Sequence, residues 1–219
     1  MSITKSEIQL NVNGKSVNAY LASPAGGGPG VLLLHAWWGL KQFFKQVCDR
    51  IAEQGFTVLA PDYYQGRIAG TVDEAKALME NNNEELMGDV IKAAHDHLAA
   101  QTGRPIGMIG FSMGAGWSLA VASKEPDVAA VVLFYGANIV DFKTLKANVL
   151  GHFSDVDEWE PFEWVEKMQA EMKSAGVDFT LHVYPGVAHW FVEEDRPEYD
   201  SAAAQLAWER TFAFLRENL

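Results

Sequence analysis

The stretch from residue 106 to residue 122 constrains the fold more than any other part of this chain. It begins as an apolar run typical of a buried strand, reaches Ser112 between Gly110 and Gly114, and continues as an apolar helix. A turn this sharp between strand and helix leaves no room for a side chain at either glycine position. The pattern is that of a nucleophile elbow, which strains the backbone at the serine and exposes its hydroxyl above the edge of a sheet.

Ser112 alone does not establish a site, because the bare Gly-x-Ser-x-Gly pattern occurs by chance in roughly one chain in ten of this length. The apolar strand before Ser112 and the apolar helix after it make a chance match several-fold less frequent. A serine of this kind also needs a base and an acid, which must lie elsewhere in the chain.

The composition limits the kinds of protein and partner to consider. With 219 residues, 48% of them hydrophobic, the chain suits one globular domain over residues 1–219. Its formal net charge of −12 argues against nucleic acid or an anionic membrane as partner and favours a small-molecule substrate. No apolar run reaches 18 residues and no secretory signal pattern is present. The single cysteine, Cys48, fits a reducing cytoplasm, and we expect it to pack in the core.

The order of strands and helices predicts an α/β fold. Two alternating runs, residues 7–12 and 16–22, flank Asn13-Gly14, which is a strong signal for a two-residue hairpin. Six later segments are typical of strands, and the first of them, residues 30–35, is continuously apolar, as a strand covered on both faces must be. They are residues 30–35, 56–60, 106–110, 128–135, 148–153 and 179–184, and the expected helices are 43–54, 71–100 with a break near 81–83, 117–122, 161–174 and 202–218. This order predicts a mostly parallel sheet with an antiparallel N-terminal hairpin and helices on both faces, the architecture of an α/β-hydrolase.

In such a sheet the reactive groups gather at the C-terminal ends of the strands, which favours His189 among the six histidines as the base. His189 follows the last predicted strand, in a loop restricted by Pro185 and Gly186. The chain order serine, acid, histidine is also the one expected for this architecture.

Four of the other histidines fit the role of base less well. His95 and His97 lie two residues apart in a charged helical stretch, so we expect them on different helix faces as solvated residues. His182 lies inside an alternating strand and is expected to pack there or to face a helix. His35 ends a strand close to the expected site but precedes the nucleophile, which favours a structural role or a place in the pocket wall.

The acid is expected after the strand that precedes the last one, where Asp155, Asp157 and Glu158 follow. We favour Asp157, because it lies four residues before Pro161, which opens the next helix, and its side chain can point inward from that loop. Asp155 is the alternative. A metal site formed by His152, Asp155 and Asp157 is conceivable, but no second group of ligands lies nearby in the sequence, so we expect no metal and no cofactor.

Six segments of the chain, taken together, are similar to the motifs of one known protein family. They are Leu34-His35-Ala36-Trp37-Trp38-Gly39, Ala60-Pro61-Asp62-Tyr63-Tyr64, Gly110-Phe111-Ser112-Met113-Gly114, residues 157–161, Tyr184-Pro185-Gly186-Val187-Ala188-His189-Trp190-Phe191 and Arg196-Pro197-Glu198-Tyr199-Asp200. This combination resembles the dienelactone hydrolase family over residues 16–219. The resemblance implies a minimal α/β-hydrolase without a large lid, in which Ser112, His189 and Asp157 form a catalytic triad.

Three positions depart from the best-studied branch of that family, which hydrolyses dienelactone. That branch has a cysteine nucleophile where this chain has Ser112, and a glutamate where this chain has Ala36. An arginine that follows its catalytic histidine helps to bind the substrate carboxylate, whereas here the segment after His189 is Trp190-Phe191-Val192-Glu193. All three departures weaken the case for an anionic lactone substrate.

The expected chemistry is acyl transfer to water through Ser112, His189 and Asp157. The backbone N–H groups of Met113 and Trp37 are the expected oxyanion hole. Six side chains are expected to line a compact pocket for small uncharged esters or lactones, namely His35, Trp38, Tyr63, Tyr64, Trp159 and Trp190. Two alternatives stay open: hydrolysis of an anionic lactone, as by a carboxymethylenebutenolidase, and a ligand-binding protein of the same fold with little turnover.

Overall fold

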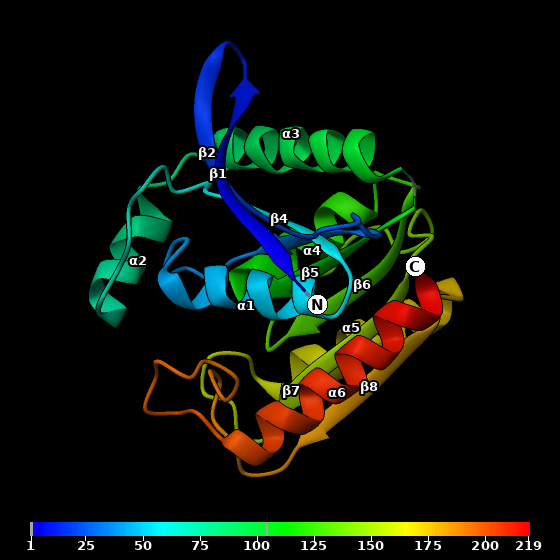
Figure 1. Cartoon of the computed structure of the whole chain (residues 1–219). Helices are drawn as coiled ribbons and strands as arrows, with labels where there is room; N and C mark the ends of the chain where they lie inside the picture. Colours follow the sequence, from blue (N-terminus) through cyan, green and yellow to red (C-terminus); the bar gives the residue numbers. More distant parts are fainter. Residues whose placement is uncertain (1, 104) are drawn as a thin grey trace. The chain divides into compact units, whose positions relative to one another are not determined.

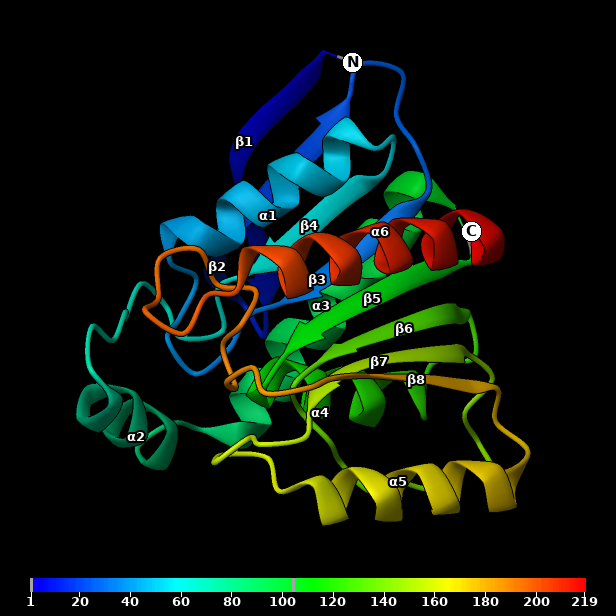
Figure 2. The same cartoon turned by 90° about the horizontal axis from the view of Figure 1, so that it is seen from below.

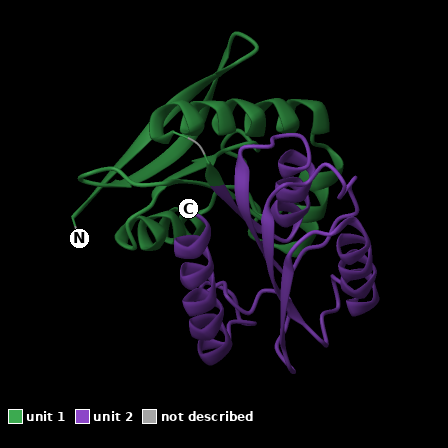
Figure 3. Cartoon of the chain, turned by 90° about the vertical axis from the view of Figure 1, so that its right-hand side faces the viewer, with its two compact units in different colours: residues 1–106 green, residues 107–219 purple. Residues whose placement is uncertain are grey.

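The structure, a computed structural model, describes residues 2–103 and 105–219. It divides into two compact units, residues 1–106 and residues 107–219, which Figure 3 shows in green and purple. We describe each unit by itself. The expectation of one domain over the whole chain stays a prediction.

The strands of the first unit begin with the predicted hairpin. β1 (Ile3–Val12) pairs antiparallel with β2 (Lys15–Pro24) across the two-residue turn Asn13-Gly14, where both residues have positive φ, 52° and 79°. Such φ values are what a type I′ turn requires, so the Asn-Gly prediction is confirmed. β2 then pairs antiparallel with β4 (Thr57–Pro61), and β4 pairs parallel with β3 (Gly30–Leu34). Every residue of β3 and β4 is buried, as the continuous apolar sequence of β3 predicts for that strand.

Three helices accompany these strands. α1 (Gln42–Glu53) packs on β2 and β4, and α3 (Glu84–Thr102) packs on β1, β3 and β4 from the opposite side (Figure 1). α2 (Val72–Glu80) ends at Asn81, and the Asn83 side chain caps α3 by accepting a hydrogen bond from the Leu86 N–H at 3.0 Å. The predicted break near residues 81–83 is therefore confirmed, and its cause is that asparagine side chains compete for backbone hydrogen bonds at helix ends.

One prediction for α3 is wrong. His95 was expected to be solvated, but it is completely buried, whereas His97 is exposed as expected. The charged residues next to His95 in the sequence suggested an exposed position. A helix that packs on a sheet, however, buries one face regardless of the charges on the other. Cys48 is completely buried on α1, which confirms its expected place in the core.

The strands of the second unit are β5 (Ile106–Phe111), β6 (Val128–Phe134), β7 (Asn148–Ser154) and β8 (Phe179–Tyr184), adjacent in that order. β6, β7 and β8 run parallel, with Ser154 paired to Tyr184 at the end of the β7–β8 register. Parallel strands end at the same edge, so the segments that follow β5, β6, β7 and β8 are brought together there.

Helices cover both faces of these strands. α4 (Met113–Ala122) and α5 (Phe162–Ala175) lie on one face, and α6 (Ser201–Asn218) lies on the other (Figure 2). With the antiparallel hairpin of the first unit, this arrangement confirms the predicted fold class. Among the described residues, no helix combines the length and apolar character that crossing a membrane would demand.

Candidate active site

The turn that carries Ser112 is as tight as its glycines predict. Ser112 follows β5 directly with φ 51° and ψ −116°, a conformation that residues other than glycine rarely adopt. Its N–H donates to the Phe134 carbonyl at 2.8 Å, which ties the elbow to the end of β6. A Cβ on Gly110 would lie 2.3 Å from the Gly114 carbonyl oxygen. The close approach of strand and helix therefore requires glycine at position 110.

His189 lies within hydrogen-bond distance of both of its predicted partners. Its Nε2 is 2.9 Å from Ser112 Oγ, and its Nδ1 is 2.6 Å from Asp157 Oδ2. Because an ionised carboxylate carries no proton, Nδ1–H is the donor to Asp157, and Nε2 is left to accept from the serine hydroxyl. The imidazole and the carboxylate are 4% and 1% exposed, so little water competes for these bonds.

The Asp157 carboxylate is oriented by the backbone that follows it. Its Oδ1 accepts hydrogen bonds from the N–H groups of Trp159, at 2.8 Å, and Glu160, at 2.9 Å. These bonds form a local turn in which the aspartate side chain replaces a backbone carbonyl. With Oδ1 held in this way, Oδ2 points at His189.

Asp155, the alternative acid, binds the loop that carries His189 instead of the imidazole. Its Oδ1 accepts from the Gly186 N–H at 2.8 Å. Next to it, the Ser154 hydroxyl donates to the Val187 carbonyl and accepts from the Val156 N–H at 3.0 Å. The end of β7 therefore holds the histidine loop at two points. Sequence reasoning missed Ser154, because nothing in the sequence distinguishes it from any serine at the end of a strand.

Glu160 is a further acidic group beside this turn. Its Oε2 accepts from the Ala137 N–H at 3.1 Å, so its side chain joins the turn after β7 to the segment after β6. Burial, with a smaller contribution from the negative charge of Asp157, raises the pKa of Glu160 to about 7. The site thus contains, besides Asp157, the carboxyl group of Glu160, and the Glu160 carboxyl group changes charge near neutral pH.

Two of the six predicted pocket residues lie beside His189 in the second unit. Trp190 is 2% exposed and meets the imidazole edge-on, with ring centroids 5.3 Å apart. Trp159 lies against Trp190, with centroids 5.6 Å apart, and the Arg196 guanidinium lies 4.6 Å from the Trp190 ring centroid. These rings support the imidazole on one side.

The other four predicted pocket residues lie in the first unit, and three of them, His35, Tyr63 and Tyr64, pack against one another. His35 stacks on Tyr63 with ring centroids 3.7 Å apart and meets Tyr64 edge-on at 5.4 Å. The Tyr63 hydroxyl donates to the His35 carbonyl, and burial lowers the pKa of His35 to about 3. Trp38 meets Trp37 edge-on at 5.5 Å, and all five side chains are buried. Their role as pocket lining, and that of Trp37 as an oxyanion donor, stays a prediction.

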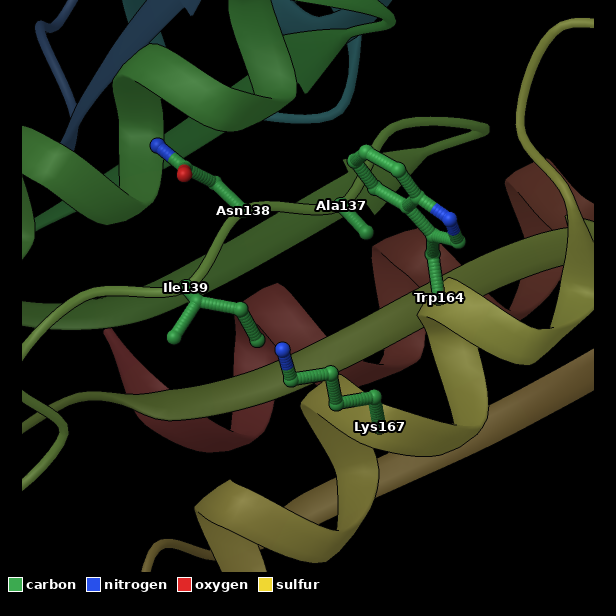
Figure 4. Close-up of a pocket in the computed structure, with 5 residues that line it drawn as sticks. All are labelled: Ala137, Asn138, Ile139, Trp164 and Lys167. Carbon is green, nitrogen blue, oxygen red and sulfur yellow. The ribbon is translucent and has the colours of Figure 1, made fainter.

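A pocket of about 420 Å³ lies in the second unit between the segment after β6 and α5 (Figure 4). It is lined by Ala137, Asn138, Ile139, Trp164 and Lys167. The Asn138 amide donates to the Gly116 carbonyl in the first turns of α4 at 3.1 Å, so the cavity wall is bonded to the helix that begins at the nucleophile. Sequence reasoning identified none of these residues, because the cavity forms only where the segment after β6 meets α5.

The residues considered as metal ligands have other partners. His152 has its Nδ1 2.9 Å from the Tyr184 hydroxyl and its Nε2 3.0 Å from the Thr211 hydroxyl. Asp157 binds His189 and two backbone N–H groups, and Asp155 binds the histidine loop. This geometry makes His152 a buried structural residue between β7, β8 and α6.

Comparison with known proteins identifies the family of the chain. The model of the dienelactone hydrolase family matches residues 17–219. A protein named usf from Aquifex pyrophilus is 36% identical, over 97% of this chain and 98% of the relative. A relative from Aquifex aeolicus, named "Putative carboxymethylenebutenolidase", is 31% identical over the same shares of the two chains. Among solved structures, a dienelactone hydrolase-like promiscuous phosphotriesterase from metagenomic libraries has a TM-score of 0.88 at 20% identity, covering 100% of this chain and 99% of that one, which shows the fold alone.

Proposed function

We propose, from the premise that the chain belongs to the dienelactone hydrolase family, that it hydrolyses small carboxylic esters or lactones with Ser112 as nucleophile. The observation that carries this proposal is the pair of hydrogen bonds at His189, 2.9 Å to Ser112 Oγ and 2.6 Å to Asp157 Oδ2. A serine, an imidazole and a buried carboxylate in this relation are equipped for nucleophilic acyl transfer.

In the first half of the reaction, Ser112 Oγ attacks the ester carbonyl carbon while His189 Nε2 takes the hydroxyl proton. Asp157 holds the imidazole in the tautomer that can accept this proton and stabilises the positive charge that results. The imidazolium then gives its proton to the leaving alcohol, and an acyl-enzyme remains. In the second half, His189 activates water by the same route, and the carboxylic acid leaves Ser112.

The negative oxygen of the tetrahedral intermediate needs hydrogen-bond donors. We propose the Met113 N–H as one donor, since Met113 is the first residue of α4 and directly follows the nucleophile. The Trp37 N–H is the second donor expected from the sequence and stays a prediction. A single donor of this kind is typically worth about 3–4 kcal/mol of transition-state stabilisation.

An uncharged substrate is favoured by the residues around His189. The segment that follows His189, residues 190–193, contains no arginine, so it lacks the positive charge that binds a substrate carboxylate in the best-studied branch of the family. The name of the Aquifex aeolicus relative favours the alternative, a lactonase that acts on an anionic substrate. Comparing kcat/KM for dienelactone with that for an uncharged lactone of similar size separates the two, and we expect the uncharged lactone to be the better substrate.

The decisive experiment measures hydrolysis of a short-chain p-nitrophenyl ester by the wild type and by Ser112→Ala. We expect kcat to fall by about 10⁴-fold or more, because the oxyanion donors and binding alone then remain. Ser123→Ala is the matched control: Ser123 caps the end of the same helix through a bond to the Ala120 carbonyl and should keep full activity. If Ser112→Ala keeps most of the activity, Ser112 is not the nucleophile. If the wild type binds the ester without turning it over, the protein is a ligand-binding member of the fold.

A further inference from the structure

The Glu160 side chain makes a connection that the mechanism above does not use. Its Oε2 accepts a hydrogen bond from the N–H of Ala137, the third residue after β6, at 3.1 Å. Glu160 itself lies beyond the end of β7 and directly before Pro161, the residue that caps α5. This hydrogen bond, which we call the Glu160 link, joins residues that are 23 positions apart in the chain.

One end of the Glu160 link lies against the nucleophile. The Ser112 N–H donates to the carbonyl of Phe134, the last residue of β6, at 2.8 Å. Two residues further on, Gly136 packs so closely on the elbow that an added Cβ would lie 2.2 Å from the Ser112 carbonyl oxygen. Ala137 follows directly. The N–H group that Glu160 binds thus belongs to the segment that fixes the backbone of Ser112.

The other end of the Glu160 link lies in the turn that carries the acid. The Glu160 N–H donates to Asp157 Oδ1 at 2.9 Å, and Asp157 Oδ2 lies 2.6 Å from His189 Nδ1. Ser154 and Asp155, just before this turn, bind the loop that carries His189. The Glu160 side chain binds in a different direction, toward the elbow.

These contacts complete a circuit around the site. One arm runs from Ser112 through His189 to Asp157, over 2.9 Å and 2.6 Å. The second arm runs from Asp157 through the Glu160 N–H and the Glu160 link to the segment beside Ser112. The first arm changes during the proposed reaction, because the imidazole takes and gives a proton in each half. The second arm joins the acid to the nucleophile by a route that bypasses the imidazole.

The Glu160 link does not depend on the charge of the carboxyl group. Burial raises the pKa of Glu160 to about 7, against the opposing effect of the Ala137 N–H and with a smaller contribution from the negative charge of Asp157. Protonated or ionised, a carboxyl group keeps an oxygen that can accept from an N–H. The link therefore needs an acceptor oxygen on a side chain of this length, which glutamine also supplies and aspartate does not.

We propose that Glu160 is a positioning residue: through the Glu160 link, it holds the turn that orients Asp157 in place relative to Ser112. This inference rests on the proposed function, since it assigns Asp157 and Ser112 their parts in the triad. The reason is geometric, because a displacement of about 1 Å in a catalytic group can cost about a hundredfold in rate. In this role Glu160 acts through Asp157 and not on the substrate.

The first test compares three substitutions at position 160 in the hydrolysis of a short-chain p-nitrophenyl ester. Glu160→Ala removes the acceptor, and Glu160→Asp keeps the charge but is too short to reach Ala137. For both we expect kcat about 10- to 100-fold lower with KM little changed. Glu160→Gln keeps reach and acceptor and should retain kcat within about threefold.

The matched control for this series is Glu158→Ala, which removes an exposed carboxyl group from the same turn and should change neither kcat nor KM. Circular dichroism verifies that each variant is folded. If Glu160→Gln is as impaired as Glu160→Ala, or if folded Glu160→Ala and Glu160→Asp keep full activity, the inference is wrong.

The second test asks whether Glu160 acts through Asp157. In an Asp157→Asn background the acid is already lost, so adding Glu160→Ala should lower kcat far less than it does in the wild type. A general loosening of the structure would cost the same factor in both backgrounds, and that result would contradict a positioning role.

The third test needs no turnover and separates failure of this inference from failure of the proposed function. In the protein without substrate, the NMR signal of the His189 Nδ1 proton reports the bond to Asp157. Glu160→Ala should shift or broaden this signal, whereas Glu160→Gln and Glu158→Ala should leave it unchanged. An unchanged signal in Glu160→Ala would overturn the inference even if Ser112 is the nucleophile. The expected signal change in a protein that hydrolyses no ester would overturn the proposed function alone.

Discussion

Asp155 and Asp157 lie two residues apart in the sequence and bind different parts of the loop that carries His189. Asp157 Oδ2 lies 2.6 Å from the His189 Nδ1, whereas Asp155 Oδ1 accepts from the Gly186 N–H at 2.8 Å. Two carboxylates that are hard to rank by sequence thus have separate tasks, one at the imidazole and one at the base of its loop.

This separation predicts different effects for the two amide variants. Asp157→Asn should lower kcat by about 10⁴-fold with little change in KM, because an amide favours the wrong imidazole tautomer. Asp155→Asn keeps an acceptor oxygen for the Gly186 N–H, so its kcat should fall by less than about tenfold. Steady-state kinetics on one ester, with circular dichroism to verify folding, checks both variants. The opposite ranking would make Asp155 the acid.

Gly136→Ala should disturb the nucleophile without touching any side chain of the site. A Cβ at position 136 would lie 2.2 Å from the Ser112 carbonyl oxygen and 2.9 Å from its Cα, so the elbow must shift. We expect the free energy of unfolding to fall by about 1–3 kcal/mol and kcat to fall with it. Gly26→Ala is the control, because nothing lies within 4 Å of its added Cβ. Urea unfolding and ester hydrolysis of both variants provide the comparison, and equal effects would contradict the steric argument.

Glu160 should make the protein less stable as the pH rises through neutrality. Its pKa is raised from 4.5 to about 7 by burial, so between these values the folded protein keeps a proton that the unfolded chain has lost. The unfolded state then binds fewer protons, and stability must fall with increasing pH in this window.

Glu160→Gln removes this titration and keeps an acceptor for the Ala137 N–H. Relative to the wild type, its free energy of unfolding should therefore rise from pH 4.5 to pH 7 and level off above. The slope should stay below about 1.4 kcal/mol per pH unit, since Glu160 is half-buried and water screens part of the effect. Urea unfolding at a series of pH values measures it, and a difference independent of pH would refute the raised pKa.

His35 should make the protein less stable as the pH falls, which is the opposite of the pH dependence expected from Glu160. Burial lowers its pKa from 6.5 to about 3, so below pH 6.5 the unfolded chain takes up a proton that the folded protein refuses. Stability should therefore fall as the pH falls through this range, by at most about 1.4 kcal/mol per pH unit from this group. His35→Phe, which retains a ring to stack on Tyr63, should lose stability less steeply with acid than the wild type. If the free energies of unfolding of the two proteins fell equally steeply between pH 6.5 and pH 4, the lowered pKa of His35 would be contradicted.

Local signals in the sequence were sufficient for the parts of the fold that depend on neighbours in the chain. The Asn13-Gly14 turn and the elbow around Ser112 rest on positive φ values that few residue types adopt, and the break between α2 and α3 rests on capping by an asparagine side chain. His95 shows the limit of such reasoning: its burial depends on which face of α3 packs on the strands, and its charged neighbours gave no sign of that face.

For the candidate site, the sequence by itself determined which kinds of residue follow which strands. It placed Ser112 after β5, Asp157 after β7 and His189 after β8, because parallel strands end at one edge and an apolar run followed by polar residues marks each end. Only the tertiary structure decided which carboxylate meets the imidazole, that Ser154 and Asp155 hold the histidine loop, and that Tyr135 and Glu193 meet behind it. Those relationships join residues 31 to 58 positions apart over a few ångströms, and such distances depend on strand register and loop closure, which no local pattern in the chain encodes.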